Sequence, residues 1–224
     1  MANQDQTPHD NSQTGKQEEK STLLVLVRHG NTATTGKVLP GRLPGLNLSE
    51  EGIRQAEDVA DRLAKIEKVA AIYASPLERA QQTASPLGKR LGIKIETSEH
   101  LFECDFGDWT GRELADLYKL PEWIQVQRSP SIFRFPNGES FVEMAGRMSR
   151  FVEFIQLEHE GQTVVAYSHA DPIKTVLCTA LGMHLDMFQR LVIATCSVSA
   201  IAYSSSQTLV LGSNWQSEFS IKVT

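Results

Sequence analysis

A short apolar run near the start of the chain constrains the fold more than any other stretch. Residues 23–27 read Leu-Leu-Val-Leu-Val and continue directly into Arg28, His29 and Gly30. An uninterrupted apolar run that ends at a glycine is typical of a strand buried on both faces of a sheet. Open α/β sheets bind ligands just past the carboxyl ends of such strands. A permanent cation and an imidazole at that point predict a site that holds an anion against a nucleophile.

The rest of the chain alternates strand and helix signals. Buried strands are predicted over residues 69–74 and 163–167, and each runs into a helix. The strand over 69–74 completes a β-α-β unit, which predicts a parallel pair with the first strand. A long amphipathic helix is predicted from about Ser140 to Glu160. Weaker signals predict a short strand over 93–96 and final strands over 191–193, 198–203 and 209–211, the last two as an antiparallel edge hairpin.

The first predicted helix carries clear local signals. Ser49 is the expected N-cap, and Glu50 and Glu51 lie in the first turn, where the helix dipole favours negative charge. The apolar stripe expected to face the core consists of Ile53, Ala56, Val59, Ala60, Leu63 and Ile66.

Composition limits the classes of function. The chain has 224 residues, 41% of them hydrophobic, and a net charge of −5, which suits one α/β domain and argues against a nucleic-acid partner. No stretch approaches the roughly 20 apolar residues of a membrane span. Residues 1–21 form a polar tail that is expected to be disordered and lacks the apolar core of a secretory signal. Three scattered cysteines, Cys104, Cys178 and Cys196, match no zinc spacing and favour a reduced setting. We expect a soluble, cytoplasmic protein with no membrane partner.

Four strand or loop ends carry chemically competent groups. Two arginines, Arg28 and Arg79, can hold a phosphoryl group by forked, charge-assisted hydrogen bonds. His29 can attack phosphorus when one ring nitrogen is unprotonated, and Glu103 is the candidate acid and base for the leaving oxygen and the attacking water. His169 can donate a hydrogen bond to the oxygens on which charge builds. These are the residue types that phosphoryl transfer through a phosphohistidine requires.

Four motifs in order make the chain similar to a known family. The sequence resembles the histidine phosphatase superfamily, and within it the phosphoglycerate-mutase-like, acid-phosphatase branch, from about Thr22 to the C-terminus. The resemblance rests on Leu-Val-Arg-His-Gly-Asn-Thr at 26–32, Ser-Pro-Leu-Glu-Arg-Ala-Gln-Gln-Thr-Ala at 75–84, Glu-Cys-Asp-Phe-Gly-Asp-Trp-Thr-Gly at 103–111 and Tyr-Ser-His at 167–169.

The resemblance implies a fold and a set of roles. The fold would be α/β, a mainly parallel central sheet flanked by helices on both faces, in one domain over residues 22–224 with a cap segment at about 112–139. His29 would be the residue phosphorylated, Glu103 the proton donor, and Arg28, Arg79 and His169 the phosphate pocket. The resemblance implies no metal and no organic cofactor.

Two departures from the family pattern affect further candidate contacts. Ala170 stands where relatives often have glycine, and alanine would strain the turn if that position needs a positive φ. Thr35 stands where many relatives place an asparagine that binds phosphate. Asn31 and Thr32 either donate to phosphate or only shape the turn. We therefore treat Asn31, Thr32 and Ala170 as candidate substrate-binding residues.

Several alternatives stay open from the sequence alone. The favoured function is a phosphomonoesterase acting on a small phosphorylated molecule, because Glu103 and His169 are only 66 positions apart and mutases of this resemblance carry longer insertions. The rivals are a phosphoglycerate-type mutase and a non-catalytic member that binds a phosphorylated ligand or a protein. The edge of the final hairpin offers a surface for a homodimer. The cap segment contains three aromatic residues, Trp123, Phe133 and Phe135, with Arg128 and Arg134 near them in the sequence. The aromatic side chains either line a substrate mouth or pack a core of their own.

Overall fold

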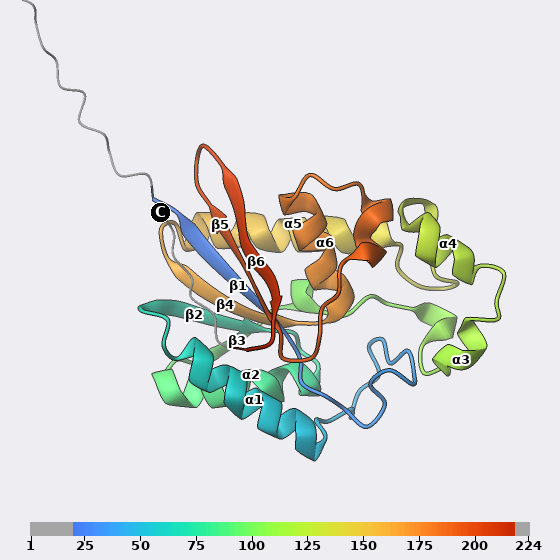
Figure 1. Ribbon diagram of the computed structural model, residues 1–224, viewed down its shortest axis with the longest axis horizontal. Coiled ribbons are helices and arrows are strands. Elements are labelled where there is room, and N and C mark those ends of the chain that lie inside the picture. The colour runs from blue at the N-terminus through green and yellow to red at the C-terminus, as the bar shows by residue number, and fades with distance from the viewer. Residues whose placement is uncertain (1–19, 218–224) are drawn as a thin grey trace, which may run out of the picture.

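The computed structural model describes residues 20–217 and shows one six-stranded sheet with helices on both sides (Figure 1). The strands lie in the order β3-β2-β4-β1-β5-β6. Parallel pairs join β3 to β2, β2 to β4 and β4 to β1, whereas β5 and β6 are antiparallel. The α/β class and the mainly parallel sheet are confirmed. The strand bounds are β1 Thr22–Arg28, β2 Val69–Ala74, β3 Ile95–Thr97, β4 Thr163–Ser168, β5 Val198–Tyr203 and β6 Thr208–Trp215.

Two expectations about the sheet were wrong. The first two strands are parallel in one sheet but do not pair, because β4 lies between β1 and β2. Residues 191–193 form no strand. The backbone here forms hydrogen bonds with side chains and not with a neighbouring strand. Arg28 Nη1 donates to the Ile193 carbonyl at 2.6 Å, and the next amide, that of Ala194, donates to the Asn214 side chain at 2.7 Å.

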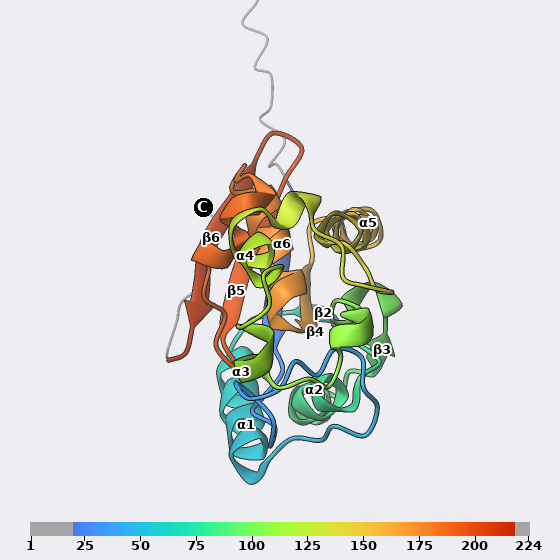
Figure 2. The same cartoon turned by 90° about the vertical axis from the view of Figure 1, so that its right-hand side faces the viewer.

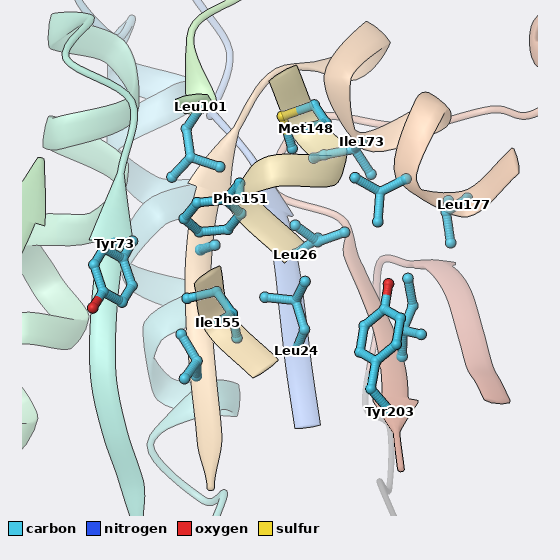
Figure 3. Packing of buried hydrophobic residues seen from close by; sticks show 14 of the residues in the cluster. Leu24, Leu26, Tyr73, Leu101, Met148, Phe151, Ile155, Ile173, Leu177 and Tyr203 are labelled. Atoms are coloured by element: carbon cyan, nitrogen blue, oxygen red, sulfur yellow. The ribbon is translucent and has the colours of Figure 1, made fainter. Parts of the chain in front are cut away.

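Four helices bury the two faces of the sheet. The helices α1 (Glu50–Leu63) and α2 (Glu78–Leu91) cover one face, and α5 (Phe141–Glu158) and α6 (Ala170–Ala180) cover the other (Figure 1). Along β1 the side chains alternate between the two cores, as the period of a strand requires. Leu24 and Leu26 pack under α5 and α6, as Figure 3 shows, whereas Val25 and Val27 pack on the side of α1 and α2.

Capping residues set where the helices begin. Ser49 is the N-cap of α1 as expected, since its Oγ accepts from the Gly52 amide at 3.1 Å. Ser140 and Glu143 form a capping box at the start of α5. The predicted stripe of α1 was wrong at Ile53, which is 54% exposed because it lies on the solvent side of the helix. No helix within residues 20–217 is long and apolar enough to cross a membrane.

The cap lies beyond the carboxyl ends of β1 and β4 (Figures 1 and 2). It contains two short helices, α3 (Leu114–Leu117) and α4 (Trp123–Arg128). Phe133 and Phe135 are 5% and 1% exposed and belong to a third core, which supports the alternative that the cap packs its own core. Short 3₁₀ helices connect these parts: η1 Glu99–Leu101, η2 Gly107–Trp109, η3 Pro130–Ile132 and η4 Leu185–Arg190. The expected tail over 1–21 lies almost wholly outside the described residues.

Candidate active site

Parallel pairing brings the two histidines together at one edge of the sheet. Residue Arg28 of β1 lies opposite Ser168 of β4, so the residues that follow them, His29 and His169, come side by side. Their ring centroids are 5.1 Å apart. Arg79 lies in the first turn of α2, directly after β2, and is fully buried. The motif residues that are far apart in the sequence therefore converge on one buried position.

The hydrogen bond of His29 defines its reactive nitrogen. Its Nδ1 lies 2.8 Å from the carbonyl oxygen of Gly30. A carbonyl only accepts, so Nδ1 carries the hydrogen and Nε2 keeps its lone pair. Burial, together with the positive charges of Arg79 and Arg28, holds the pKa of His29 well below its usual range. The ring is therefore neutral near neutral pH and presents a nucleophilic nitrogen.

A tight turn holds His29 in this orientation. The Gly30 amide donates to Thr83 Oγ1 at 3.0 Å, and that hydroxyl donates to the Arg79 carbonyl at 2.6 Å. A Cβ at Gly30 would lie 2.7 Å from the backbone oxygen of Gly52, in α1. Only glycine allows this close approach of turn and helix.

The two arginines present buried donors that are not used by the protein. Arg79 donates through Nη2 to the Gly41 carbonyl at 2.7 Å, and Arg28 donates through Nη1 to Ile193. Within residues 20–217, Arg79 Nε and Nη1, Arg28 Nε and His169 Nδ1 are buried without a hydrogen-bond partner. Burial lowers the pKa of both guanidinium groups, which shows how unfavourable these cations are without an anion. The donor set fits a tetrahedral oxyanion.

Glu103 supplies a carboxyl group that can both give and take a proton. It is 7% exposed, and its Oε1 accepts from the Cys104 amide at 2.9 Å. Burial, reinforced by the negative charge of Asp171, raises the pKa of Glu103 to about 7, against the opposing effects of the Cys104 amide, Arg79 and Arg28. Near neutral pH the protonated and ionised forms are both present, as a general acid and base requires.

Sequence reasoning missed the three residues that hold the Glu103 loop in place, which we call the loop clamp: Arg42, Glu139 and Arg147. The Glu139 carboxylate accepts from Arg147 Nη2 and Arg42 Nη2, each at 3.0 Å, and from the Asp105 amide at 3.2 Å. Arg42 Nε donates to the Glu103 carbonyl at 2.9 Å. Arg147 donates to the Phe102 carbonyl at 2.9 Å. The backbone on both sides of Glu103 is therefore fixed, although no motif signal links these three positions.

The remaining candidates lie in the turns around the site. The Asn31 amide donates to Gln55 Oε1 at 2.9 Å, and the Thr32 amide donates to Thr35 Oγ1 at the same distance. These bonds support the role of Asn31 and Thr32 in shaping the turn, and their contact with phosphate stays a prediction. Thr35 is likewise used in this turn.

The concern over Ala170 was wrong. It is the first residue of α6, and it is not among the positive-φ residues of the described part of the chain. Alanine is therefore unstrained at this helical position. Within residues 20–217, no three His, Cys, Asp or Glu side chains are grouped so as to hold a metal ion.

Comparison with known proteins identifies the family. Residues 24–216 match the histidine phosphatase superfamily (branch 1), and the chain belongs to this superfamily. The motifs had also led us to expect its acid-phosphatase branch, and this finer placement is not supported, because that branch is branch 2. The motifs at the reacting centre did not separate the two branches.

Individual relatives carry different activities in their names. Phosphoserine phosphatase 1 of Hydrogenobacter thermophilus is 31% identical over 199 residues, covering 85% of this chain and 91% of that protein. The "Probable phosphoglycerate mutase GpmB" of Proteus mirabilis is 32% identical over 195 residues, covering 84% and 88%. The solved structure of mycobacterial glucosyl-3-phosphoglycerate phosphatase is similar with a TM-score of 0.74 at 27% identity, covering 82% of this chain and 91% of that one.

Proposed function

We propose that this protein is a phosphomonoesterase that hydrolyses a small phosphorylated molecule through a phosphohistidine at His29. One observation carries the proposal. A neutral imidazole with a free Nε2 lies in the same buried site as two guanidinium groups that have unused donors, and as a carboxyl group whose pKa is about 7. Each group meets one need of phosphoryl transfer: a nucleophile, an anion pocket and a proton carrier.

The reaction takes two balanced steps. In the first, His29 Nε2 attacks phosphorus, the bond to the ester oxygen breaks, and protonated Glu103 gives its proton to that leaving oxygen. In the second, a water molecule attacks the phosphohistidine while the Glu103 carboxylate takes one of its protons, and the bond from phosphorus to nitrogen breaks. Arg28, Arg79 and His169 hold the phosphoryl oxygens throughout, where charge develops in the transition state. The two steps need no oxidant or reductant, and together they return His29 and Glu103 to their starting protonation states.

The same residues could serve a mutase, so the fate of the phosphoryl group decides between the two. A relative named as a mutase and a relative named as a phosphatase are similar to this chain to the same degree. We favour hydrolysis because only 66 positions separate Glu103 from His169, which leaves a short cap over the intermediate. A merely binding member is disfavoured because all five groups of the site are present.

The test is turnover of p-nitrophenyl phosphate in the presence of a chelator. We compare the wild type with His29→Ala and with the control His184→Ala, whose side chain is 66% exposed. Loss of the nucleophile should lower kcat by at least about 10³-fold, and the control should stay near wild type. Activity that survives in His29→Ala contradicts the proposal. If the wild-type protein transfers the phosphoryl group to an added hydroxy compound faster than to water, the result supports the mutase instead.

A further inference from the structure

Ser75 contacts the site but has no role in the two steps above. It follows β2 directly, is fully buried, and its Oγ lies 2.9 Å from His169 Nε2. Its backbone is held on both sides. The Ser75 amide donates to the Tyr167 carbonyl at 2.9 Å, and the Gln81 side chain donates to the Ser75 carbonyl at 2.8 Å. The hydroxyl is therefore fixed against the ring of His169.

The protonation of His169 limits what its ring can do. Burial, with the nearby positive charges of Arg79, Arg28 and Arg147, holds the pKa of His169 well below its usual range. A neutral imidazole has one N–H, on either Nδ1 or Nε2. In the part of the chain that the structure describes, Nδ1 is buried without a partner, whereas Nε2 faces Ser75.

Only one tautomer suits an anion pocket. With the hydrogen on Nε2, the ring donates to Ser75 and presents a lone pair at Nδ1, and that lone pair would repel an oxyanion. With the hydrogen on Nδ1, the ring offers a donor, and Nε2 accepts from the Ser75 hydroxyl. The same serine oxygen lies 3.4 Å from the Leu77 amide, which donates to it and leaves its single proton for the ring.

We propose that Ser75 is a positioning residue whose hydroxyl donates to Nε2 of His169 and so keeps the hydrogen on Nδ1, ready to bind a phosphoryl oxygen. The partner of one ring nitrogen commonly determines the state of the other. This inference deepens the proposed function and rests on it for the identity of the bound oxyanion. The tautomer itself can be measured without any turnover.

The first measurement is ¹⁵N NMR of the full-length protein with labelled histidine. The six histidines are assigned by comparison with single-site variants, including His169→Asn. The wild type should show His169 with a protonated Nδ1 and an unprotonated Nε2, and a wild type with the hydrogen on Nε2 overturns the proposal. This arm needs no Ser75 variant, so a failure of such a variant to fold does not affect it.

The second measurement removes the hydroxyl. In Ser75→Ala we expect His169 to gain the Nε2–H form, inorganic phosphate to bind more weakly, and kcat for p-nitrophenyl phosphate to fall by about 10²-fold. The matched control is Ser199→Ala, which removes another buried hydroxyl with one backbone contact, to the Asn214 amide, in β5. It should leave the tautomer unchanged. An unchanged tautomer in Ser75→Ala, or a kcat within about threefold of wild type, overturns the proposal.

The two proposals fail in different ways. If the wild type neither hydrolyses p-nitrophenyl phosphate nor forms a phosphohistidine, the phosphatase proposal fails. The tautomer and the binding of inorganic phosphate then still decide the role of Ser75. If turnover is present and depends on His29 but the tautomer does not depend on Ser75, only the inference about Ser75 fails.

Discussion

The buried carboxyl group of Glu103 should make the protein less stable near pH 7, where this group can both give and take a proton. Folding raises the pKa of Glu103 from 4.5 to about 7, chiefly by burial. The folded protein therefore binds this proton more tightly than the unfolded chain does. The resulting stabilisation is fully present below about pH 4.5 and is lost as the pH rises through about 7. A tenfold change in proton affinity is about 1.4 kcal/mol, so the whole loss is about 3 kcal/mol.

Glu103→Gln tests this reasoning. The amide keeps an oxygen that can accept from the Cys104 backbone, and it removes the ionisation. Relative to wild type, the free energy of unfolding of the variant should rise with pH, by about 3 kcal/mol between pH 4.5 and pH 8. The same variant should lose turnover, because an amide cannot give a proton to the leaving oxygen. Urea unfolding at several pH values measures the first effect.

An exposed carboxylate of the neighbouring turn supplies the control. Glu99 is exposed and precedes the Glu103 loop in η1. Glu99→Gln should change the free energy of unfolding by less than about 0.5 kcal/mol at every pH. If the difference between wild type and Glu103→Gln does not change with pH, or changes with the opposite sign, the carboxyl group is not held as we describe.

Two further predictions concern the loop clamp and the start of α6. Arg147→Met should lower the free energy of unfolding by about 3 kcal/mol, because it leaves Glu139 with one cation fewer in a half-buried network, and it should lower kcat because Glu103 is held less firmly. Urea unfolding and turnover measure the two effects, with the exposed Arg150→Met as the control. If the two variants behave alike, the role of the loop clamp is contradicted. Ala170→Gly should destabilise by up to about 1 kcal/mol in thermal or urea unfolding, since the position is helical, whereas a stabilised variant would show that alanine is strained there.

The strands and helices that have strong periodic signals were predictable from the sequence. The run ending at Arg28, the capped start of α1 at Ser49 and the long helix after Ser140 all appear where expected. Strand order was not predictable, because nothing local indicates that β4, far along the chain, inserts between β1 and β2. Residues 191–193 have a strand-like composition, but the Ile193 carbonyl accepts from Arg28 and the amide of the next residue, Ala194, donates to Asn214.

The convergence of the proposed reacting groups was predictable from the sequence, and the residues that hold them in place were not. His29 and His169 follow strands and Arg79 lies in the first turn of the helix after β2, all in recognisable motifs, and the fold brings them together. Glu139 lies at the end of the cap segment and Arg147 lies in α5, and their role depends on a fold that brings both against the Glu103 loop. Their charges read as ordinary surface groups in the sequence. Contacts of this kind depend on tertiary structure rather than on local pattern.

Phosphorylation of His29 itself tests the central claim most directly. The protein is mixed with a ³²P-labelled phosphomonoester, quenched rapidly in alkali, which preserves phosphohistidine, and digested for peptide mapping. We predict label on the peptide that contains His29, formed at least as fast as turnover and lost on a chase with unlabelled ester. Rapid turnover with no label on His29, or label on another residue that turns over at the rate of the reaction, would contradict it.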